Sequence, residues 1–454
     1  MGNTGSSARD RLREWKGPFS DVEYECLQNK YRETIATAPS NDASVANLQI
    51  WLELPLPAGV PKELIASYHR LGTAFYQLCL QTKGGQDAPA CCDLQIIDFA
   101  QGVAQCVRAS SQAICRALFN LFGPSPQATA MTEKELFHLL FACLVMAEGR
   151  EVDDVNQMML VAMTLARAAM PPSRQSDRVS FIEFVQWTEL QLPLLYTVFT
   201  TWIAQKCFES LTKPSYEAPR LSPKSEILSR SHFVALSMVT TSLQRTLNRL
   251  YTSTQDGLSF NRLSYHILGY SGPTLTVIRD VQGAVFGMFC DTEWKESSRY
   301  YGGNGCFLFR LAPDINICRV SASGINENYM YLNSKGYALP RGLGMGGSTD
   351  KFRLFLSEDL DEQSYTIAKC LSFEPGRLSF NEHFVIDVME VWGCGGDESE
   401  HNQEKHRLET AELINRARKV DKAQFIDNDF DKETFLGKTF GHGTDKGRIA
   451  DDEQ

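Results

Sequence analysis

Residues 342–347 read GLGMGG, and the local context of this stretch separates two very different folds. Gly342, Gly344 and Gly347 satisfy the GxGxxG spacing with which dinucleotide-binding domains hold a pyrophosphate. That function needs a buried strand before the glycines and a helix after them. The preceding SKGYALPR has the composition of a loop, and the following STDKFRLFLSEDL alternates like a strand. We therefore predict a glycine-rich connection between strands, where backbones pass close together, and no nucleotide cofactor.

The overall composition is that of a globular protein with more than one domain. The chain has 454 residues, 43% of them hydrophobic and 22% charged, and this length predicts two or three domains. Its longest apolar stretches, 136–147 and 192–204, are shorter than the ~20 residues that span a bilayer. The net charge of −10 without a long basic run argues against nucleic acid as a ligand. The 13 cysteines form no CxxC pair and no apolar signal segment opens the chain, which predicts reduced thiols in the cytosol.

The opening residues, MGNTGSSARDRLREWK, carry a lipidation signal. Removal of Met1 would expose Gly2, and Ser6 provides the small hydroxyl residue of the M-G-x-x-x-[ST] pattern, so we predict N-myristoylation of Gly2 within a flexible segment, 1–17. One myristoyl chain binds a membrane only marginally, at roughly 10⁴ M⁻¹. A second contact with an anionic membrane surface is predicted for the basic residues of this segment, Arg9, Arg11, Arg13 and Lys16.

The first half of the chain is predicted to be α-helical over residues 18–210, because apolar residues recur there at three- and four-residue spacing. Two segments, DLQIIDFAQGV (93–103) and RVSFIEFVQW (178–187), resemble the short strand and second helix of an EF-hand. In the second of these loops Glu183 takes the twelfth ligand position, but Pro172, Arg174 and Ser176 take the first, third and fifth. We therefore expect an EF-hand-like bundle that binds neither calcium nor another metal, and the alternative hypothesis is a calcium-sensing adaptor.

The other candidate metal sites fail for similar reasons. If Leu94 holds the eighth position, Asp87 and Asp98 end a loop whose middle is filled by Pro89, Cys91 and Cys92. Near the C-terminus, DNDFDKETF (427–435) has Lys432 where the turn needs glycine, so we expect a solvated acidic loop within a polar tail, 427–454. Cys91 and Cys92 have no ligand partners at suitable spacing and are expected to be structural thiols.

The second half has a different pattern. A proline-punctuated linker is predicted over 211–225, followed by a helical segment at ALSMVTTSLQRTLNRLY (235–251). Short apolar or alternating runs separated by turns then predict a largely antiparallel sheet domain over 226–395. Its conspicuous motifs are LY at 250–251, GPTL at 272–275, VFG at 285–287, Trp294, CFLF at 306–309, Asn328 with Tyr329, GLGMGG at 342–347 and MEVWG at 389–393.

In their identity and order these motifs closely resemble the TLDc domain family, which includes the oxidation-resistance proteins. The resemblance implies an α+β sandwich of two sheets, in which GLGMGG precedes an antiparallel strand. The combination of a myristoylation signal, an EF-hand-like region, this domain and a C-terminal helix resembles a lipidated TLDc subgroup linked to TOR and insulin signalling on lysosomal membranes. It implies binding to the soluble sector of the vacuolar proton-pumping ATPase and to TOR pathway components, at the cytoplasmic face of the lysosome and in the cytosol.

An enzymatic function has less support in the sequence. The domain's histidines, His232, His266 and His383, belong to no GxSxG, HExxH or CxxC context, and Glu390 is expected to be paired structurally within a strand. We therefore predict a binding module without catalytic residues. The alternative hypothesis is an antioxidant enzyme or oxidative-stress protein that uses one of the domain's cysteines, such as Cys290, Cys306 or Cys370.

A charged helix is predicted over 396–426. Acidic residues open the segment and basic residues close it, which complements a helix dipole. At 100° per residue its apolar residues share a narrow stripe formed by Leu413, Ile414, Ala417 and Val420. This stripe either packs on the protein itself or binds a partner's groove.

Overall fold

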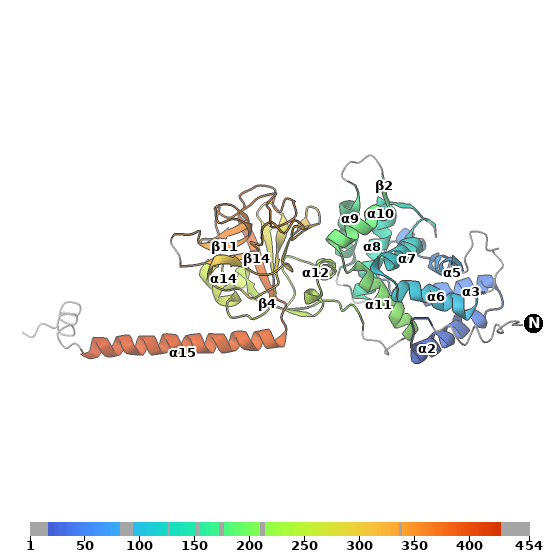
Figure 1. Ribbon diagram of the computed structural model, residues 1–454, viewed down its shortest axis with the longest axis horizontal. Coiled ribbons are helices and arrows are strands. Elements are labelled where there is room, and N and C mark those ends of the chain that lie inside the picture. Colours follow the sequence, from blue (N-terminus) through green and yellow to red (C-terminus); the bar gives the residue numbers. More distant parts are fainter. Residues whose placement is uncertain are drawn as a thin grey trace, which may run out of the picture.

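The computed structural model describes residues 17–81, 94–125, 128–149, 152, 154–171, 177–208, 214–335 and 338–427, the last eleven of these by their backbone alone. A helical lobe comes first, a strand-rich lobe follows, and one long helix, α15 (Asp397–Asp427), closes the described chain (Figure 1). The predicted order of helical region, sheet domain and C-terminal helix is thus confirmed. Within the described ranges, no helix is long and apolar enough to cross a membrane.

The helices of the first lobe have strong local start signals. Ser20, Thr132 and Ser180 each cap the first turn of a helix while a glutamate three residues later bonds back to the cap, a reciprocal capping box. The elements are α2 (Asp21–Tyr31), the π-helix η1 (Arg32–Ala36), α3 (Asn41–Trp51), α4 (Lys62–Ser67), α5 (Leu71–Gln81), α6 (Ile96–Val107), α7 (Ser111–Phe122), α8 (Glu133–Glu148), α9 (Val155–Ala169), α10 (Phe181–Gln191) and α11 (Leu195–Phe208).

Two short strands join two helix pairs within this lobe. Strand β1 (Ala130–Thr132) precedes α8, strand β2 (Arg178–Ser180) precedes α10, and they pair antiparallel with Met131 opposite Val179. The short strand expected at Val179 is therefore present, and it pairs with the strand that contains Met131. Leu94 lies outside any strand, directly before α6.

The second lobe contains two sheets. The seven-stranded sheet has the order β3-β4-β14-β5-β6-β8-β9, and the five-stranded sheet has the order β13-β12-β11-β10-β7. The strands of the larger sheet are β3 (Arg220–Ser222), β4 (Thr246–Thr252), β14 (Ile386–Gly393), β5 (Thr274–Asp280), β6 (Val285–Cys290), β8 (Phe307–Ala312) and β9 (Asn316–Arg319). Those of the smaller sheet are β13 (Tyr365–Thr366), β12 (Phe352–Ser357), β11 (Gly342–Gly347), β10 (Met330–Asn333) and β7 (Ser297–Tyr301). The helices are α12 (Arg230–Ser237), the 3₁₀ turn η2 (Thr241–Leu243), α13 (Ser253–Asp256) and α14 (Phe260–Ile267).

The GLGMGG stretch is itself a strand, β11, which corrects the expectation of a connection between strands. Leu343 and Met345 enter the core between the sheets, whereas the glycines leave room on the other face. A Cβ on Gly344 would stand 2.4 Å from the Phe352 ring, and one on Gly342 would stand 2.8 Å from the Phe355 ring. Glycine is required there because aromatic rings of the neighbouring strand fill the space that side chains would occupy.

The prediction of a helix over 235–251 is wrong for the second half of that segment. The helix α12 ends at Ser237, and Thr246–Thr252 form strand β4 between β3 and β14. Pairing on both sides overrides the helical spacing of LQRTLNRLY. The segment expected to be a linker also contributes Arg220–Ser222 as strand β3, parallel to β4.

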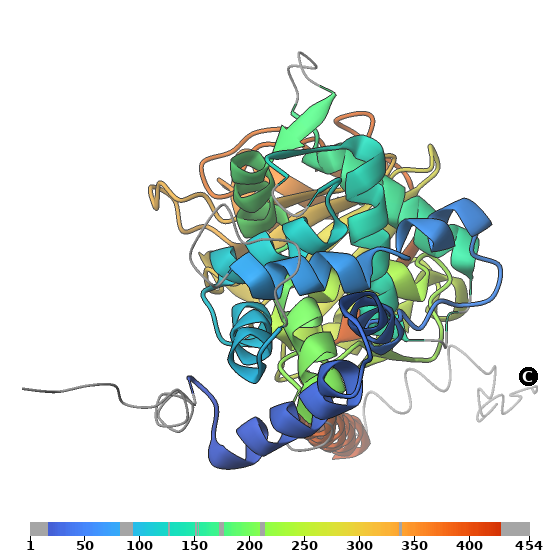
Figure 2. The same cartoon turned by 90° about the vertical axis from the view of Figure 1, so that its right-hand side faces the viewer.

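The two lobes share one apolar core. Along β8, Leu308 faces the smaller sheet, while Phe307 and Phe309 belong to the core that continues through α12 into the helical lobe. The CFLF motif is continuously apolar because its strand is buried on both faces. At the sheet edge, the Gln191 side chain at the end of α10 donates to Ile317 O (3.2 Å) and accepts from Ile317 N (2.7 Å). In Figure 2, seen from the side of the helical lobe, the helices lie in front of the sheet lobe, and α15 is seen almost end-on near the bottom.

Candidate functional site: the C-terminal helix and the lobe junction

The first turns of α15 are held on the sheet lobe. Tyr270 Oη accepts a hydrogen bond from the Gly395 amide (2.7 Å), and burial raises the pKa of this tyrosine to about 12. Asn402 Nδ2 donates to Ser271 Oγ (2.9 Å), and Gln403 Nε2 donates to the His266 carbonyl (2.6 Å). Further along the helix, the Arg407 guanidinium lies 5.0 Å from the centre of the Tyr265 ring. These contacts fix the direction in which the helix leaves the domain.

Beyond Arg407 the helix extends past the sheet lobe (Figure 1). Residues 408–416 are all exposed, including Leu413 at 63% and Ile414 at 47%. Ala417 and Val420 continue the same helix, where only the backbone is described. An isolated helix gains little stability in water without tertiary packing of its apolar face. The structure thus leaves the predicted stripe uncovered as far as Ile414.

The predicted lipidation site and the predicted membrane-contact residues all precede the described part of the chain. Gly2, Arg9, Arg11, Arg13 and Lys16 lie outside the described residues. The loop residues 87–92, the residues 172–176 and the tail 428–454 lie outside them as well. Among the described residues, no group of three or more His, Cys, Asp or Glu side chains could hold a metal ion.

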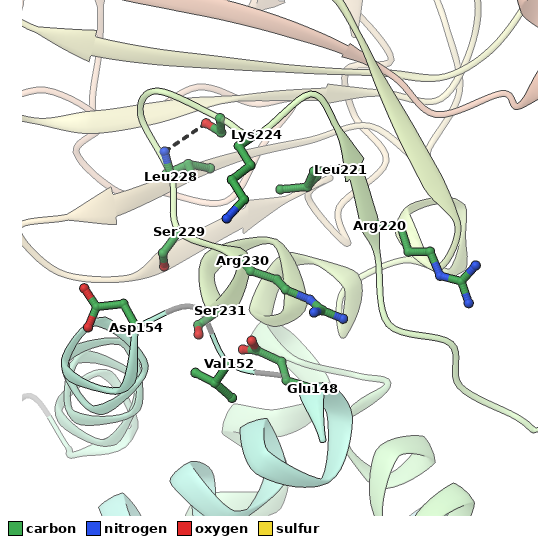
Figure 3. A pocket seen from close by; sticks show the side chains of 11 residues that line it. Glu148, Val152, Asp154, Arg220, Leu221, Lys224, Leu228, Ser229, Arg230 and Ser231 are labelled. Carbon is green, nitrogen blue, oxygen red and sulfur yellow. Dashed lines mark hydrogen bonds between the residues drawn. The ribbon is translucent and has the colours of Figure 1, made fainter. Parts of the chain in front are cut away.

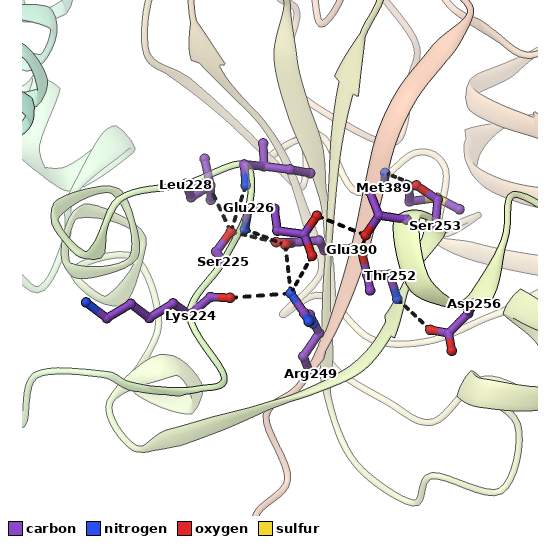
Figure 4. Close-up of polar contacts among 12 residues, drawn as sticks. Lys224, Ser225, Glu226, Leu228, Arg249, Thr252, Ser253, Asp256, Met389 and Glu390 are labelled. Atoms are coloured by element: carbon purple, nitrogen blue, oxygen red, sulfur yellow. Dashed lines mark hydrogen bonds and ion pairs between the residues drawn. The ribbon is translucent and has the colours of Figure 1, made fainter.

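The chain crosses from the helical lobe to the sheet lobe beside a cavity of about 540 Å³ (Figure 3). Next to it, Glu390 on β14 is fully buried. Its Oε2 accepts hydrogen bonds from Ser225 Oγ (2.6 Å) and Trp392 Nε1 (3.1 Å), and its Oε1 accepts one from the Glu226 amide (2.7 Å) (Figure 4). Arg249 Nη1 lies 3.5 Å from Oε1 and 3.2 Å from Glu226 Oε1. The carboxylate thus holds the segment at residues 225–226 against β14, inside the larger sheet, and its role is structural.

Each histidine of the sheet lobe has a local partner. His266 Nε2 lies 3.5 Å from Asp256 Oδ1, and His383 Nδ1 lies 3.0 Å from the Glu362 carbonyl. His232 Nδ1 lies 2.8 Å from Ser229 Oγ, a pair with the atoms of a nucleophile and its base. Burial lowers the pKa of His232 to about 4, far from the value near neutrality that suits a general base. The pair spans three residues at the start of α12 and is a local helix contact.

The cysteines of the described residues are all free thiols. Burial raises the pKa of Cys290 well above its ordinary value, and it also raises the pKa of Cys306 and Cys394. Cys318 is buried too, and its pKa is raised by burial despite the nearby Arg353 guanidinium. A reactive cysteine needs an accessible thiolate, so these environments disfavour peroxide chemistry. Cys370 is the partly exposed thiol of this group.

Several residues that organise the site carry no signal in the sequence. Gln191 is one polar residue at the end of a helix, and Tyr270 is one aromatic residue in a loop. Their partners are backbone groups at 317 and 395, far away in the chain. A pattern of side chains in one sequence cannot predict such contacts, because backbone acceptors and donors are present at every position.

Comparison with known proteins bears on the sheet lobe. Residues 221–395 match the family model described as TLDc domain. The chain is 35% identical over 154 residues to "MTOR-associated protein MEAK7" of Gallus gallus, covering 34% of this chain and 32% of the relative. It is 31% identical over 221 residues to the protein of the same name in Danio rerio, covering 47% and 44%. "Oxidation resistance protein 1" of Xenopus tropicalis is 26% identical over 183 residues, covering 40% and 20%. The matches span less than half the length of each relative.

Proposed function

We propose that this chain, whose residues 221–395 form a TLDc domain, is a non-enzymatic, membrane-anchored regulator of the vacuolar proton-pumping ATPase that acts in TOR signalling. The name of the MEAK7 relatives, MTOR-associated protein, supports the link to TOR. The observation that carries the proposal is α15. Its base is fixed on the TLDc domain, while its outer turns expose Leu413 and Ile414 to a partner.

The direct test is capture of the pump. Full-length protein and a version ending at Gly396 are used to pull down pump subunits and ATP hydrolysis from detergent-solubilised lysosomal membranes. Binding by the full-length protein alone would assign recognition to α15, and equal binding would assign it to the TLDc domain. Absence of the pump with both proteins would refute the proposal.

Single substitutions resolve the role of the apolar stripe. Leu413→Asp should weaken pump binding, because it puts a charge into the apolar contact. Asn415→Asp is the matched control, since it adds the same charge one residue past Ile414, about 200° around the helix from Leu413. If both variants bind as the wild type does, the stripe is not the contact surface.

Membrane attachment is a further part of the proposal. Gly2 would carry myristate, and Arg9, Arg11, Arg13 and Lys16 would contact anionic lipid. Labelling with a clickable myristate analogue should mark the wild type and spare Gly2→Ala. Labelling of the variant would place the lipid elsewhere.

The helical lobe is proposed to be EF-hand-like and free of calcium. Glu183 Oε2 accepts hydrogen bonds from the Ser180 amide (2.8 Å) and hydroxyl (2.7 Å), so the carboxylate at the twelfth position caps its helix. Asp98 accepts from the Gln95 amide in the same way (2.8 Å). Calcium at millimolar concentration should leave the melting temperature unchanged, whereas a saturable rise would contradict this reading.

An oxidative-stress function is the second candidate, because the oxidation-resistance relative shares the TLDc domain. It predicts catalytic consumption of peroxide that is lost in a single Cys→Ser variant. The buried thiols predict the opposite, and a thiol-specific reagent should label Cys370 before Cys290, Cys306 or Cys394 in the native protein.

A further inference from the structure

The cavity at the lobe junction has features of a binding site that the proposed function does not use. Its volume of about 540 Å³ lies in the range typical of small-molecule sites, about 300–1,000 Å³. One wall is formed by the end of α8 and the start of α9, and the other by β3, the following loop and the start of α12. Any molecule that fills it would touch both lobes (Figure 3).

The first turn of α12 presents amide hydrogens that no side chain caps. Ser229 is the N-cap residue and has the extended backbone of a capping serine, but its hydroxyl makes no bond to the helix amides. It lies 2.8 Å from His232 Nδ1 instead. The N-terminal amides of a helix carry partial positive charge and bind anions, phosphate groups above all.

Ser231 supplies a second and independent indication. This side chain is only 2% exposed and lines the cavity. Among the described residues, the structure provides no hydrogen-bond partner for its hydroxyl. The hydroxyl can therefore donate to an acceptor that occupies the cavity.

The charges around the cavity are divided between its walls. Lys224, Arg220 and Arg230 line the side of the sheet lobe, and Figure 3 shows the Lys224 ammonium group on the side of Ser229. Glu148 and Asp154 line the side of the helical lobe. Asp154 Oδ1 accepts hydrogen bonds from the amides of residues 156 (2.9 Å) and 157 (3.2 Å), so it caps α9 and keeps one oxygen for another donor.

We propose that this cavity binds a small molecule that carries a phosphate monoester on a polyhydroxylated body, such as a sugar phosphate. The phosphate lies at the start of α12, where it accepts hydrogen bonds from Ser231 and the helix amides and pairs with Lys224. The hydroxyl groups donate to the carboxylates of the helical lobe. Because the ligand contacts both lobes, its binding stabilises their arrangement against separation.

The test uses the full-length protein and three probes, glucose 6-phosphate, inorganic phosphate and glucose, at constant ionic strength. Glucose 6-phosphate should raise the melting temperature in a saturable way and bind more tightly than phosphate, while glucose alone should have no effect. No shift with either phosphate compound would overturn the proposal. Equal affinity for phosphate and glucose 6-phosphate would overturn the part that concerns the hydroxylated body.

Two variants test whether the ligand binds in this cavity. Lys224→Ala should weaken binding of glucose 6-phosphate about tenfold, and Ser231→Ala about fivefold, as expected for one charge-assisted and one neutral hydrogen bond. Ser231→Ala should not lower the stability of the free protein, because its hydroxyl has no partner to lose among the described residues. Lys351→Ala is the matched control, since Lys351 is 61% exposed and pairs with Glu382. Wild-type affinity in both Lys224→Ala and Ser231→Ala would refute the site.

Discussion

Replacement of Glu390 would test whether the junction of the lobes depends on one buried carboxylate. In Glu390→Gln, one oxygen becomes an amide that can only donate. If the remaining carbonyl oxygen keeps its hydrogen bond from the Glu226 amide, the new NH₂ group takes the place of Oε2. Trp392 Nε1, which lies 3.1 Å from that position, is also a donor and therefore loses its acceptor. The Ser225 hydroxyl already accepts hydrogen bonds from the amides of Ile227 and Leu228, so neither it nor the indole can accept from the new amide.

The expected cost follows from this count of donors. One buried donor without a partner costs about 1–3 kcal/mol, and removing one member of a buried ion pair costs about 3–5 kcal/mol. Arg249 keeps Glu226 at 3.2 Å and the Lys224 carbonyl at 3.3 Å, which reduces the second contribution. We therefore expect Glu390→Gln to lower the free energy of unfolding by about 2–4 kcal/mol. Glu390→Ala, which leaves every donor to this carboxylate without its acceptor, should lower it by about 4–5 kcal/mol.

Urea denaturation measures the total loss, and hydrogen exchange read by mass spectrometry shows where it occurs. The amides of Ile227 and Leu228 donate to Ser225 Oγ (3.1 and 3.0 Å), so they should exchange faster once Ser225 loses its anchor. Glu382→Gln is the control, because Glu382 is 55% exposed in its pair with Lys351 and should cost no more than about 1 kcal/mol. A loss below about 1 kcal/mol in Glu390→Gln, with unchanged exchange at 225–228, would refute the reasoning.

Three further outcomes are expected. Gln191→Ala strands the buried amide and carbonyl of Ile317 and should cost about 1–3 kcal/mol, with faster exchange of the Ile317 amide; protection equal to that of the wild type would contradict the edge contact. Burial lowers the pKa of His232 from 6.5 to about 4, so as the pH falls the unfolded chain takes up this proton before the folded protein does. The free energy of unfolding should therefore fall as the pH drops from 6.5 towards 4, by up to roughly 3 kcal/mol. His232→Asn, which keeps an acceptor for Ser229, should flatten that part of the stability curve, and parallel curves would disprove the assignment. Gly344→Ala places a Cβ 2.4 Å from the Phe352 ring, which is held by Tyr331 and Phe355, and should cost about 1–3 kcal/mol; an unchanged melting temperature would show that the ring can move.

The helical region was predictable because its signals are local. Its helices begin at serine and threonine caps followed by glutamate, and these motifs occur in adjacent residues of the sequence. The same locality explains the error over Thr246–Thr252. There the spacing of apolar residues favours a helix, but the pairing of β4 with β3 and β14 decides the structure.

The candidate site was predictable only in part. The stripe containing Leu413 and Ile414 follows from helical periodicity, because it faces no other part of the described chain. The contacts that hold α15 on the sheet lobe and the cavity beside α12 join residues far apart in the chain, such as Tyr270 with Gly395, 125 positions apart, and Asp154 with Ser231, 77 positions apart. Their meeting depends on how the layers stack, which no periodic pattern encodes.

The sequence by itself determined the order of the helical region, the sheet domain and the C-terminal helix, and the TLDc motifs of the sheet domain. These conclusions rest on motifs and alternation, which record the environment of each residue and its immediate neighbours. Only the tertiary structure decided that the glycines form a strand beneath aromatic rings, that Glu390 fastens the lobe junction and that the helices share a core with the sheet. The physical reason is that close packing and buried hydrogen bonds join residues distant in the chain, so their partners are fixed only when the whole chain has folded.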